Sequence, residues 1–310
     1  MSKTALLFAG QGAQTVGMGM DLAAKYPTAK AWFDRANAAL GYDLTAICFH
    51  GPEAELTKTE NTQPGVFLMS WIALQLLKEQ VPDLKFDAAA GLSLGEFTAL
   101  TAAGAMSFEE GLRVVRQRGK FMQEACEVTQ GGMAAIIGLD EAATRAACVE
   151  AGVTLANLNC PGQLVISGAA GNIAKACELA QAKGAKRAIP LPVAGAYHSP
   201  LMASAQPKLK VELATMRISP PRVPVISNVT AQPHGSPAEI SRRLVEQVTS
   251  PVLWEKSVRL LLAQGYTRFI ELGPGTALSG FMKRIDKTVQ MLNVADGASL
   301  EATVKAMKSL

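Results

Sequence analysis

Short apolar runs alternate with helix-length segments along most of the chain. Residues 5–9 and 86–90 are runs typical of short buried strands, whereas residues 63–78 are apolar on nearly every face, as in a deeply buried helix. Glycine-rich turns separate such segments. The alternation predicts an α/β fold with a mainly parallel sheet. Further helices are predicted over residues 21–40, 96–103, 107–125, 201–216, 236–248 and 254–264, and further strands over 223–228 and 268–272.

The middle of the chain has a different pattern. Between residues 131 and 193 the predicted order is strand, helix, strand, strand, helix, strand, which is that of a ferredoxin-like unit. The α/β pattern resumes after it. We therefore predict a discontinuous α/β domain of residues 1–128 and 196–310, with a ferredoxin-like subdomain of residues 129–195 inserted into it.

Composition narrows the class of protein. Only 18% of the 310 residues are charged, so the chain is compact rather than disordered, and its net charge of +4 is too small for a nucleic-acid-binding surface. The first apolar run is too short for a signal peptide or a membrane span. Five cysteines without C-x-x-C spacing indicate a reducing compartment without structural disulfides or zinc. We expect a cytoplasmic protein.

A serine between two glycines, in the sequence Gly-Leu-Ser-Leu-Gly at residues 91–95, is the most informative motif. It lies between a predicted strand and a predicted helix, which is the position of a nucleophile elbow. The glycines permit a tight turn that holds Ser93 in strained geometry with its hydroxyl exposed. The amides and the positive dipole end of the helix then face any oxyanion formed there. A glycine-rich turn with an incidental serine is the alternative.

A serine nucleophile needs a base, usually a histidine, and the chain has three histidines. His50 lies at the entry to a loop, and His234 lies in a polar turn of the kind in which histidines are solvated. His198 follows the last strand of the inserted segment, where two parts of the chain meet and clefts form. We therefore expect His198 to be the base.

Arg118 is unusual for its place on a predicted helix. Val114, Phe121 and Ala125 share its face, so its guanidinium lies within or beside an apolar stripe. A desolvated guanidinium requires an anionic partner, and its planar fork suits a carboxylate. Spacing alone favours a structural ion pair with an internal Asp or Glu over the binding of a carboxylate ligand.

Two glycine-rich turns follow predicted strands. Residues 10–15 lack the third glycine of a dinucleotide-binding motif, because Thr15 occupies its position, and they fit equally well as a loop that donates backbone N–H groups. Residues 273–275 are either a cleft-lining turn or a plain connection.

Taken together, these segments resemble the malonyl-CoA:acyl carrier protein transacylases and the related acyltransferase domains of polyketide synthases. The resemblance extends over essentially the whole chain and implies a hydrolase-like α/β core with an inserted ferredoxin-like subdomain. It rests on residues 10–14, 62–64, 91–95, 117–122, 157–163 and 271–275, and on His198.

The resemblance implies a role for each matching position. Ser93 is expected to be the nucleophile, His198 its base, and Arg118 the group that binds the free carboxylate of a malonyl substrate. The other matching positions are Gln11 and Leu94, whose backbone amides would form the oxyanion hole, Gln247, whose backbone carbonyl would orient the histidine, and Gln63, Asn159 and Gln163, which would line the site.

The activity implied is transfer of a malonyl group from malonyl-CoA to the phosphopantetheine thiol of acyl carrier protein, through a malonyl-serine intermediate, for fatty acid biosynthesis. No metal or other cofactor is expected, nor any nucleic-acid or membrane partner, and the protein is expected to be a monomer. Its carrier protein should be acidic. Candidate docking charges, which also fit ordinary solvated faces, are Lys183, Lys186 and Arg187, or Lys283 and Arg284.

Two features depart from the family pattern. Leu92 stands where the family usually has histidine, and Ala196 with Tyr197 looks more like the malonyl-selective polyketide enzymes. Fatty-acid and polyketide pathways therefore both remain open.

A serine hydrolase is the first rival function, but such enzymes place the histidine last and use an HGGG-type loop, which this chain lacks. A non-catalytic subunit that binds carrier protein is the second.

Overall fold

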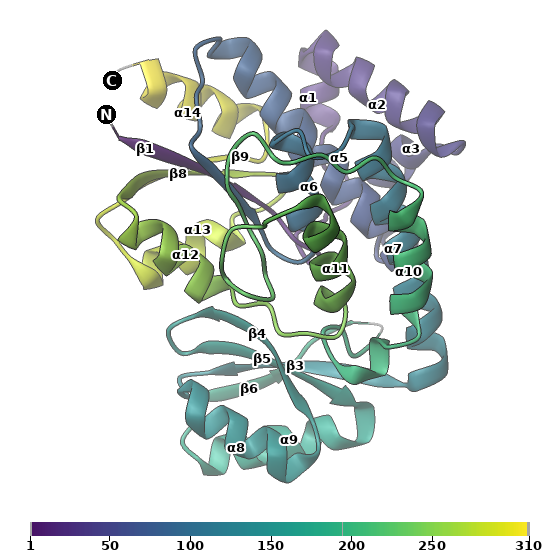
Figure 1. Ribbon diagram of the computed structural model, residues 1–310, viewed down its shortest axis with the longest axis vertical. Helices are drawn as coiled ribbons and strands as arrows, with labels where there is room; N and C mark the ends of the chain where they lie inside the picture. The colour runs from purple at the N-terminus through teal and green to yellow at the C-terminus, as the bar shows by residue number, and fades with distance from the viewer. Residues whose placement is uncertain (1, 194, 309–310) are drawn as a thin grey trace.

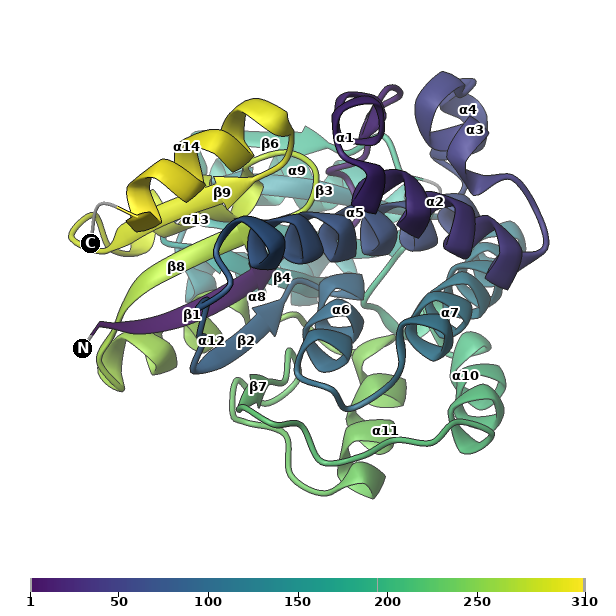
Figure 2. The ribbon, with the colours of Figure 1, turned by 90° about the horizontal axis from the view of Figure 1, so that it is seen from above.

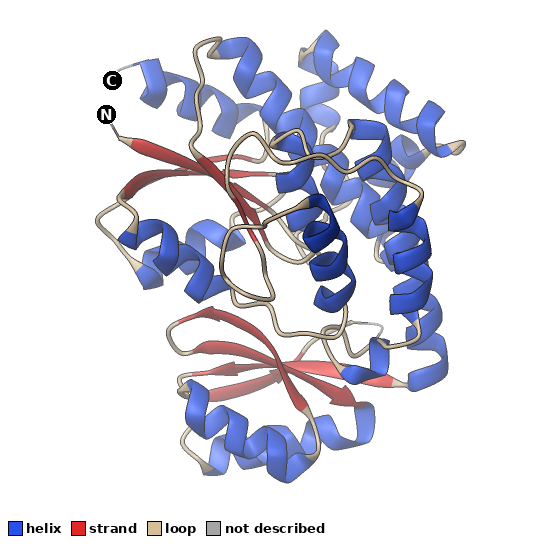
Figure 3. Cartoon of the chain, in the orientation of Figure 1, coloured by secondary structure: helices blue, strands red, loops and turns tan. Residues whose placement is uncertain are grey.

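The computed structural model describes residues 2–193 and 195–308, which form two sheets, each packed against helices (Figures 1 and 3). The larger sheet is entirely parallel, with the strand order β7-β2-β1-β8-β9. Its strands are β1 (Lys3–Phe8), β2 (Ala88–Gly91), β7 (Val225–Ile226), β8 (Tyr266–Leu272) and β9 (Gln290–Val294).

The larger sheet is buried on both faces, which explains its apolar strands. Successive side chains of β1 point to opposite faces, so Leu6 and Phe8 join one apolar cluster while Ala5 and Leu7 join another. The first cluster lies under α5 (Thr59–Gln80), α6 (Leu94–Ala102) and α14 (Gly297–Lys308), and the second under α12 (Trp254–Ala263) and α13 (Ala277–Ile285) (Figure 2).

The remaining helices of the larger part lie around α5 and α6. The buried faces of α2, α7, α10 and α11 extend the first apolar cluster. Figure 2 shows α2 and α7 beside α5. These helices are α1 (Met20–Lys25), α2 (Pro27–Leu40), α3 (Leu44–His50), α4 (Glu53–Leu56), α7 (Phe108–Thr129), α10 (Ala205–Ala214) and α11 (Pro237–Gln247).

The smaller sheet is antiparallel, with the strand order β4-β5-β3-β6. Its two helices pack on one face, as the lower part of Figure 1 shows. The elements follow the predicted β-α-β-β-α-β order, so the α/β fold with a ferredoxin-like insertion is confirmed. The boundaries at residues 129 and 195 stay a prediction. The elements are β3 (Gly131–Ile137), α8 (Glu141–Ala151), β4 (Thr154–Cys160), β5 (Gln163–Ala169), α9 (Ala170–Ala182) and β6 (Arg187–Pro190).

Hydrogen bonds join the smaller sheet to the larger part of the fold. The Val252 segment, just before α12, pairs with β4, because the Leu158 amide donates to the Val252 carbonyl at 2.9 Å and the Val252 amide to the Ala156 carbonyl at 2.8 Å. Arg284 of α13 donates to the carbonyl of Pro161, in the turn between β4 and β5, at 2.7 Å. The small sheet is therefore held along its β4 edge.

Several predicted elements differ from the structure. The single helix over residues 21–40 is wrong, because it is interrupted at Tyr26 and resumes with Pro27. The strand over 223–228 is reduced to two paired residues, and the helix over 201–216 is a 3₁₀ turn (Pro200–Met202) followed by α10. Five elements were not predicted: α3, α4, α13, β9 and α14.

Within residues 2–193 and 195–308, no helix combines the length and the apolar character needed to cross a bilayer. In the same residues, no three His, Cys, Asp or Glu side chains gather into a group that could hold a metal ion. All five cysteines are buried as free thiols.

Candidate active site

The turn between β2 and α6 forms a nucleophile elbow around Ser93. Ser93 has a left-handed φ of 55° with ψ −106°, a conformation that costs free energy in a non-glycine residue. A Cβ added to Gly91 would overlap the carbonyl group of Gly95, and one added to Gly95 would overlap the carbonyl oxygen of Phe8. Both glycines are therefore required by close backbone approach, as the sequence indicated.

Asn228, which sequence reasoning missed, holds this strained turn at both ends. Its Oδ1 accepts a hydrogen bond from the Ser93 amide at 2.7 Å, and its Nδ2 donates to the Gly91 carbonyl at 2.8 Å. Asn228 is fully buried, where unsatisfied amide groups would be costly. A polar residue at the end of an apolar strand was the available signal.

His198 lies directly against the serine. Its Nε2 is 2.8 Å from Ser93 Oγ, and its Nδ1 is 2.9 Å from the Gln247 carbonyl and 3.2 Å from the Ser250 carbonyl. Carbonyl oxygens only accept, so Nδ1 carries the proton and Nε2 is left to accept one from the serine. Burial, with the nearby charge of Arg118, lowers the pKa of His198 from 6.5 to about 4. The imidazole is therefore neutral at neutral pH.

Arg118 points into the same site from α7. Its Nη1 donates to Gln63 Oε1 at 2.7 Å, and its Nη2 donates to Ser93 Oγ at 3.1 Å and to Gln247 Oε1 at 2.9 Å. The side chain is 1% exposed, and burial lowers its pKa to about 10, so it stays cationic at neutral pH. Within the described part of the chain Arg118 makes no ion pair with a carboxylate. The structural ion pair favoured by spacing alone is therefore absent there.

The loop after β1 lies beside the elbow. A Cβ on Gly10 would be 2.5 Å from the carbonyl oxygen of Leu92, so the two backbones are in contact range. Next in this loop is Gln11, whose side chain donates to Thr59 Oγ1 at 3.5 Å. Leu94 is the first residue of α6, a position whose amide has no partner within its own helix. An oxyanion hole formed by the Gln11 and Leu94 amides stays a prediction.

Asn159 and Gln163 lie on the smaller sheet, apart from this hydrogen-bonded group. Gln163 Oε1 accepts from Arg284 at 3.2 Å, and Asn159 is buried with no hydrogen-bond partner for its Oδ1. Among the described residues, no hydrogen bond joins either side chain to Ser93 or His198. The structure thus brings together Ser93, His198, Arg118, Gln63 and Gln247, but not this pair.

The other two histidines are elsewhere. The prediction that His234 is solvated is wrong, because its side chain is fully buried and its Nε2 lies 2.6 Å from Glu96 Oε1. The buried Glu96 carboxylate holds the histidine there, and the polar sequence around His234 does not indicate this partner. His50 is exposed and is the last residue of α3, at the entry to a loop as predicted.

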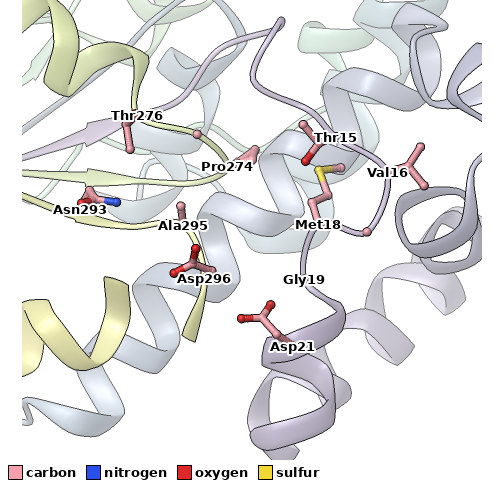
Figure 4. Close-up of a pocket in the computed structure, with 12 residues that line it drawn as sticks. Thr15, Val16, Met18, Gly19, Asp21, Pro274, Thr276, Asn293, Ala295 and Asp296 are labelled. Carbon is pink, nitrogen blue, oxygen red and sulfur yellow. The ribbon is translucent and has the colours of Figure 1, made fainter. Parts of the chain in front are cut away.

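A cavity of ≈ 420 Å³ opens near the carboxyl ends of β1, β8 and β9 (Figure 4). Pro274 and Gly275 line it, so the second glycine-rich turn does border a hollow, although Ser93 and His198 do not. Figure 4 shows Asp21 and Asp296 on its walls. The remaining lining residues are Thr15, Val16, Gly17, Met18, Gly19, Thr276, Asn293 and Ala295.

Fold and site together define an acyl-transferring enzyme of the serine class, with a serine on a strand–helix elbow hydrogen-bonded to a neutral histidine. The sequence matches the acyl transferase domain over residues 5–306. The malonyl CoA-acyl carrier protein transacylase of Bacillus subtilis (strain 168) is 46% identical over 313 residues, covering 99% of this chain and 98% of that protein. The chain belongs to the malonyl CoA-acyl carrier protein transacylase family.

Solved structures agree with the fold. The malonyl-CoA:acyl carrier protein transacylase of Xanthomonas oryzae has a TM-score of 0.95 and 39% identity, covering 99% of this chain and 98% of its own. A malonyl-transacylase in complex with a type II polyketide synthase acyl-carrier protein also has a TM-score of 0.95 and 39% identity, covering 98% of this chain and 100% of its own.

Proposed function

We propose that this protein transfers a malonyl group from malonyl-CoA to the phosphopantetheine thiol of an acyl carrier protein, through a malonyl ester on Ser93. One observation carries the proposal. The Ser93 hydroxyl lies 2.8 Å from a neutral histidine nitrogen and 3.1 Å from the guanidinium of Arg118. A base for the serine and a cation for a carboxylate therefore meet at one oxygen atom.

In the acylation step, Ser93 Oγ attacks the thioester carbonyl of malonyl-CoA while its proton passes to His198 Nε2. The tetrahedral oxyanion is stabilised by the backbone amides of Gln11 and Leu94. Collapse of this intermediate breaks the carbon–sulfur bond, and His198 returns the proton to the coenzyme A thiolate. The Gln247 carbonyl, 2.9 Å from Nδ1, keeps the imidazole oriented throughout and stabilises its transient positive charge.

The transfer step repeats this chemistry in reverse. The phosphopantetheine thiol gives its proton to His198 Nε2 and attacks the ester carbonyl. Ser93 Oγ then leaves and recovers the proton. The reaction uses no cofactor, since the coenzyme A thioester is itself a substrate.

Arg118 is assigned to the malonyl carboxylate. Its described partners at Gln63 and Gln247 are neutral amide oxygens, so a substrate carboxylate would supply the directly bonded anion that this buried guanidinium lacks. Asn159 and Gln163 remain candidates for more distant contacts with the substrate.

Docking of an acidic carrier protein is assigned to the α13 side of the joint between the sheets. Lys283 and Arg284 are both exposed there, and Arg284 already bridges to the small sheet. Lys183, by contrast, forms an ion pair with Glu150 at 3.2 Å. The carrier belongs to fatty acid biosynthesis, and a polyketide carrier is the alternative, favoured by the relative solved with such a partner.

Two further features complete the proposal. The chain acts as a monomer in the cytoplasm, a reducing compartment that suits its five buried free thiols. Its cleft is formed between the two units predicted from the sequence, residues 1–128 with 196–310, and residues 129–195.

Transfer and hydrolysis are separated by following radiolabelled malonyl-CoA with and without holo-acyl carrier protein. We expect label to move to the carrier much faster than to free malonate. Release to water that outpaces transfer would support the serine hydrolase instead. No turnover with either acceptor would support a non-catalytic binding subunit.

A further inference from the structure

A buried carboxylate lies one helical turn below the serine. Glu96 is in the first turn of α6, where the positive end of the helix dipole favours a negative charge. It is fully buried and accepts three hydrogen bonds: from His234 Nε2 at 2.6 Å, the Asn228 amide at 3.0 Å and Gln247 Nε2 at 2.7 Å. None of the catalytic steps above uses Glu96.

The bond to Gln247 connects Glu96 with the arginine. Gln247 Nε2 donates to Glu96 Oε2 and, at 3.0 Å, to the Ser93 carbonyl, while its Oε1 accepts from Arg118 Nη2 at 2.9 Å. Asn228 Oδ1, at 3.5 Å, is a third and weaker acceptor for Nε2. Acceptors on one side and a cationic donor on the other leave the amide one favourable orientation. Glu96 therefore fixes the atom against which the guanidinium rests.

The bond to Asn228 connects Glu96 with the elbow. The Asn228 amide that donates to Glu96 belongs to the residue whose side chain clamps Ser93 and Gly91. Loss of the carboxylate would leave this amide unpaired in a dry interior, which favours a shift of the backbone that carries the clamp.

We propose that Glu96 is a positioning residue for malonyl recognition, acting on Arg118 through Gln247 and on Ser93 through Asn228. This inference rests on the proposed function. Glu96 touches neither substrate nor the reacting atoms. Its effect should therefore fall mainly on the malonyl-to-acetyl selectivity, which depends on the arginine, and only secondarily on transfer of a neutral acyl group.

The test is the ratio of kcat/KM for malonyl-CoA to that for acetyl-CoA. Glu96→Met keeps the side-chain length but accepts no hydrogen bond, and it should lower the ratio by about 10- to 100-fold, the scale of a small misplacement of a binding group. Glu96→Gln can still accept from Gln247 and Asn228, so it should stay within about threefold of the wild type. Glu271→Met is the matched control, because Glu271 is a buried carboxylate with three donors outside this network, at Leu278 and Ser279.

A double-variant cycle shows whether Glu96 acts through Gln247. Gln247→Met removes the side-chain amide but keeps the backbone carbonyl that faces His198. In that background Glu96→Met should lower the ratio no further. An unchanged ratio in Glu96→Met, a fall of the same size in Glu271→Met, or effects that multiply in the double variant would overturn the proposal.

Glu96→Asp covers the case in which Glu96→Met does not fold. It keeps the charge but withdraws the carboxylate by one methylene from Gln247, so a fall in the ratio is again expected, and a wild-type ratio contradicts the proposal. A wild-type protein that transfers no malonyl group would refute the proposed function itself, which is a distinguishable result.

Discussion

Replacing Arg118 with alanine should abolish most malonyl transfer while acetyl transfer holds steady or rises. The guanidinium is 1% exposed, and its described partners are a serine hydroxyl and the neutral amides of Gln63 and Gln247. A malonyl carboxylate would complete this set with an anion. An acetyl group has no carboxylate and leaves the buried cation unpaired, so removing the cation removes a penalty for acetyl and an attraction for malonyl.

The size of the effect follows from the burial of this pair. Truncating one member of a buried, hydrogen-bonded charge pair costs about 2–5 kcal/mol. At about 1.4 kcal/mol for each tenfold change, kcat/KM for malonyl-CoA should fall by about 30- to 5,000-fold. Arg118→Lys should recover little of this loss, because an ammonium group cannot present two parallel donors to a carboxylate or span from Gln63 to Gln247.

The assay measures kcat/KM for malonyl-CoA and for acetyl-CoA with one holo-carrier protein as acceptor. Arg113→Ala is the matched control, since Arg113 is exposed on the same helix. Thermal melting of each variant reports its folding. Equal losses for both substrates in Arg118→Ala, or unfolding at the assay temperature, would show that Arg118 is a structural residue and not the group that selects malonyl over acetyl.

Four further predictions concern the base and the elbow. His198→Ala should lower transfer far more than Glu96→Gln, and equal losses would indicate a charged third member of a triad. Because neutral His198 is the active form and its pKa is lowered to about 4, the acid limb of kcat/KM should lie near pH 4, and a limb near pH 6.5 would contradict it. In the unfolded chain the His198 imidazole has its ordinary pKa of 6.5, so it is protonated at a higher pH than in the folded protein. The free energy of unfolding should therefore fall as the pH is lowered from 6.5 towards 4, which denaturant titration measures. Gly95→Ala should destabilise the protein severely in a thermal melt, because its Cβ would overlap the Phe8 carbonyl, whereas Gly171→Ala has open space and should not.

The sequence predicted elements whose burial leaves a simple pattern. The nearly all-round apolar α5 and the short apolar runs of β3 and β5 were found because core packing dictates their side chains. The C-terminal β9 (Gln290–Val294) was missed, since only Val294 is fully buried and no clear alternation results. The break at Tyr26 had a signal in Pro27, which begins a helix at its first position, but the apolar period obscured it.

The candidate site was predicted in part. Ser93, His198 and Arg118 were predicted because each side chain needs a partner for its chemistry. In the structure the Ser93 hydroxyl contacts both the histidine and the arginine. The supporting residues Asn228 and Glu96 were missed, because their task is to satisfy buried donors contributed by distant segments, and sequence spacing does not show such partners. The same reason explains the wrong prediction for His234, whose side chain also contacts the buried Glu96 carboxylate.

The proposed transfer depends on a malonyl ester at Ser93, which the mass of the intact protein after brief mixing with malonyl-CoA would reveal. We expect a mass increase of one malonyl group, mapped by peptide analysis to Ser93 and discharged on addition of holo-acyl carrier protein. Ser93→Ala should show no increase. An adduct that persists in Ser93→Ala, that maps to a thiol such as Cys160, or that never forms would show that Ser93 does not carry the malonyl group.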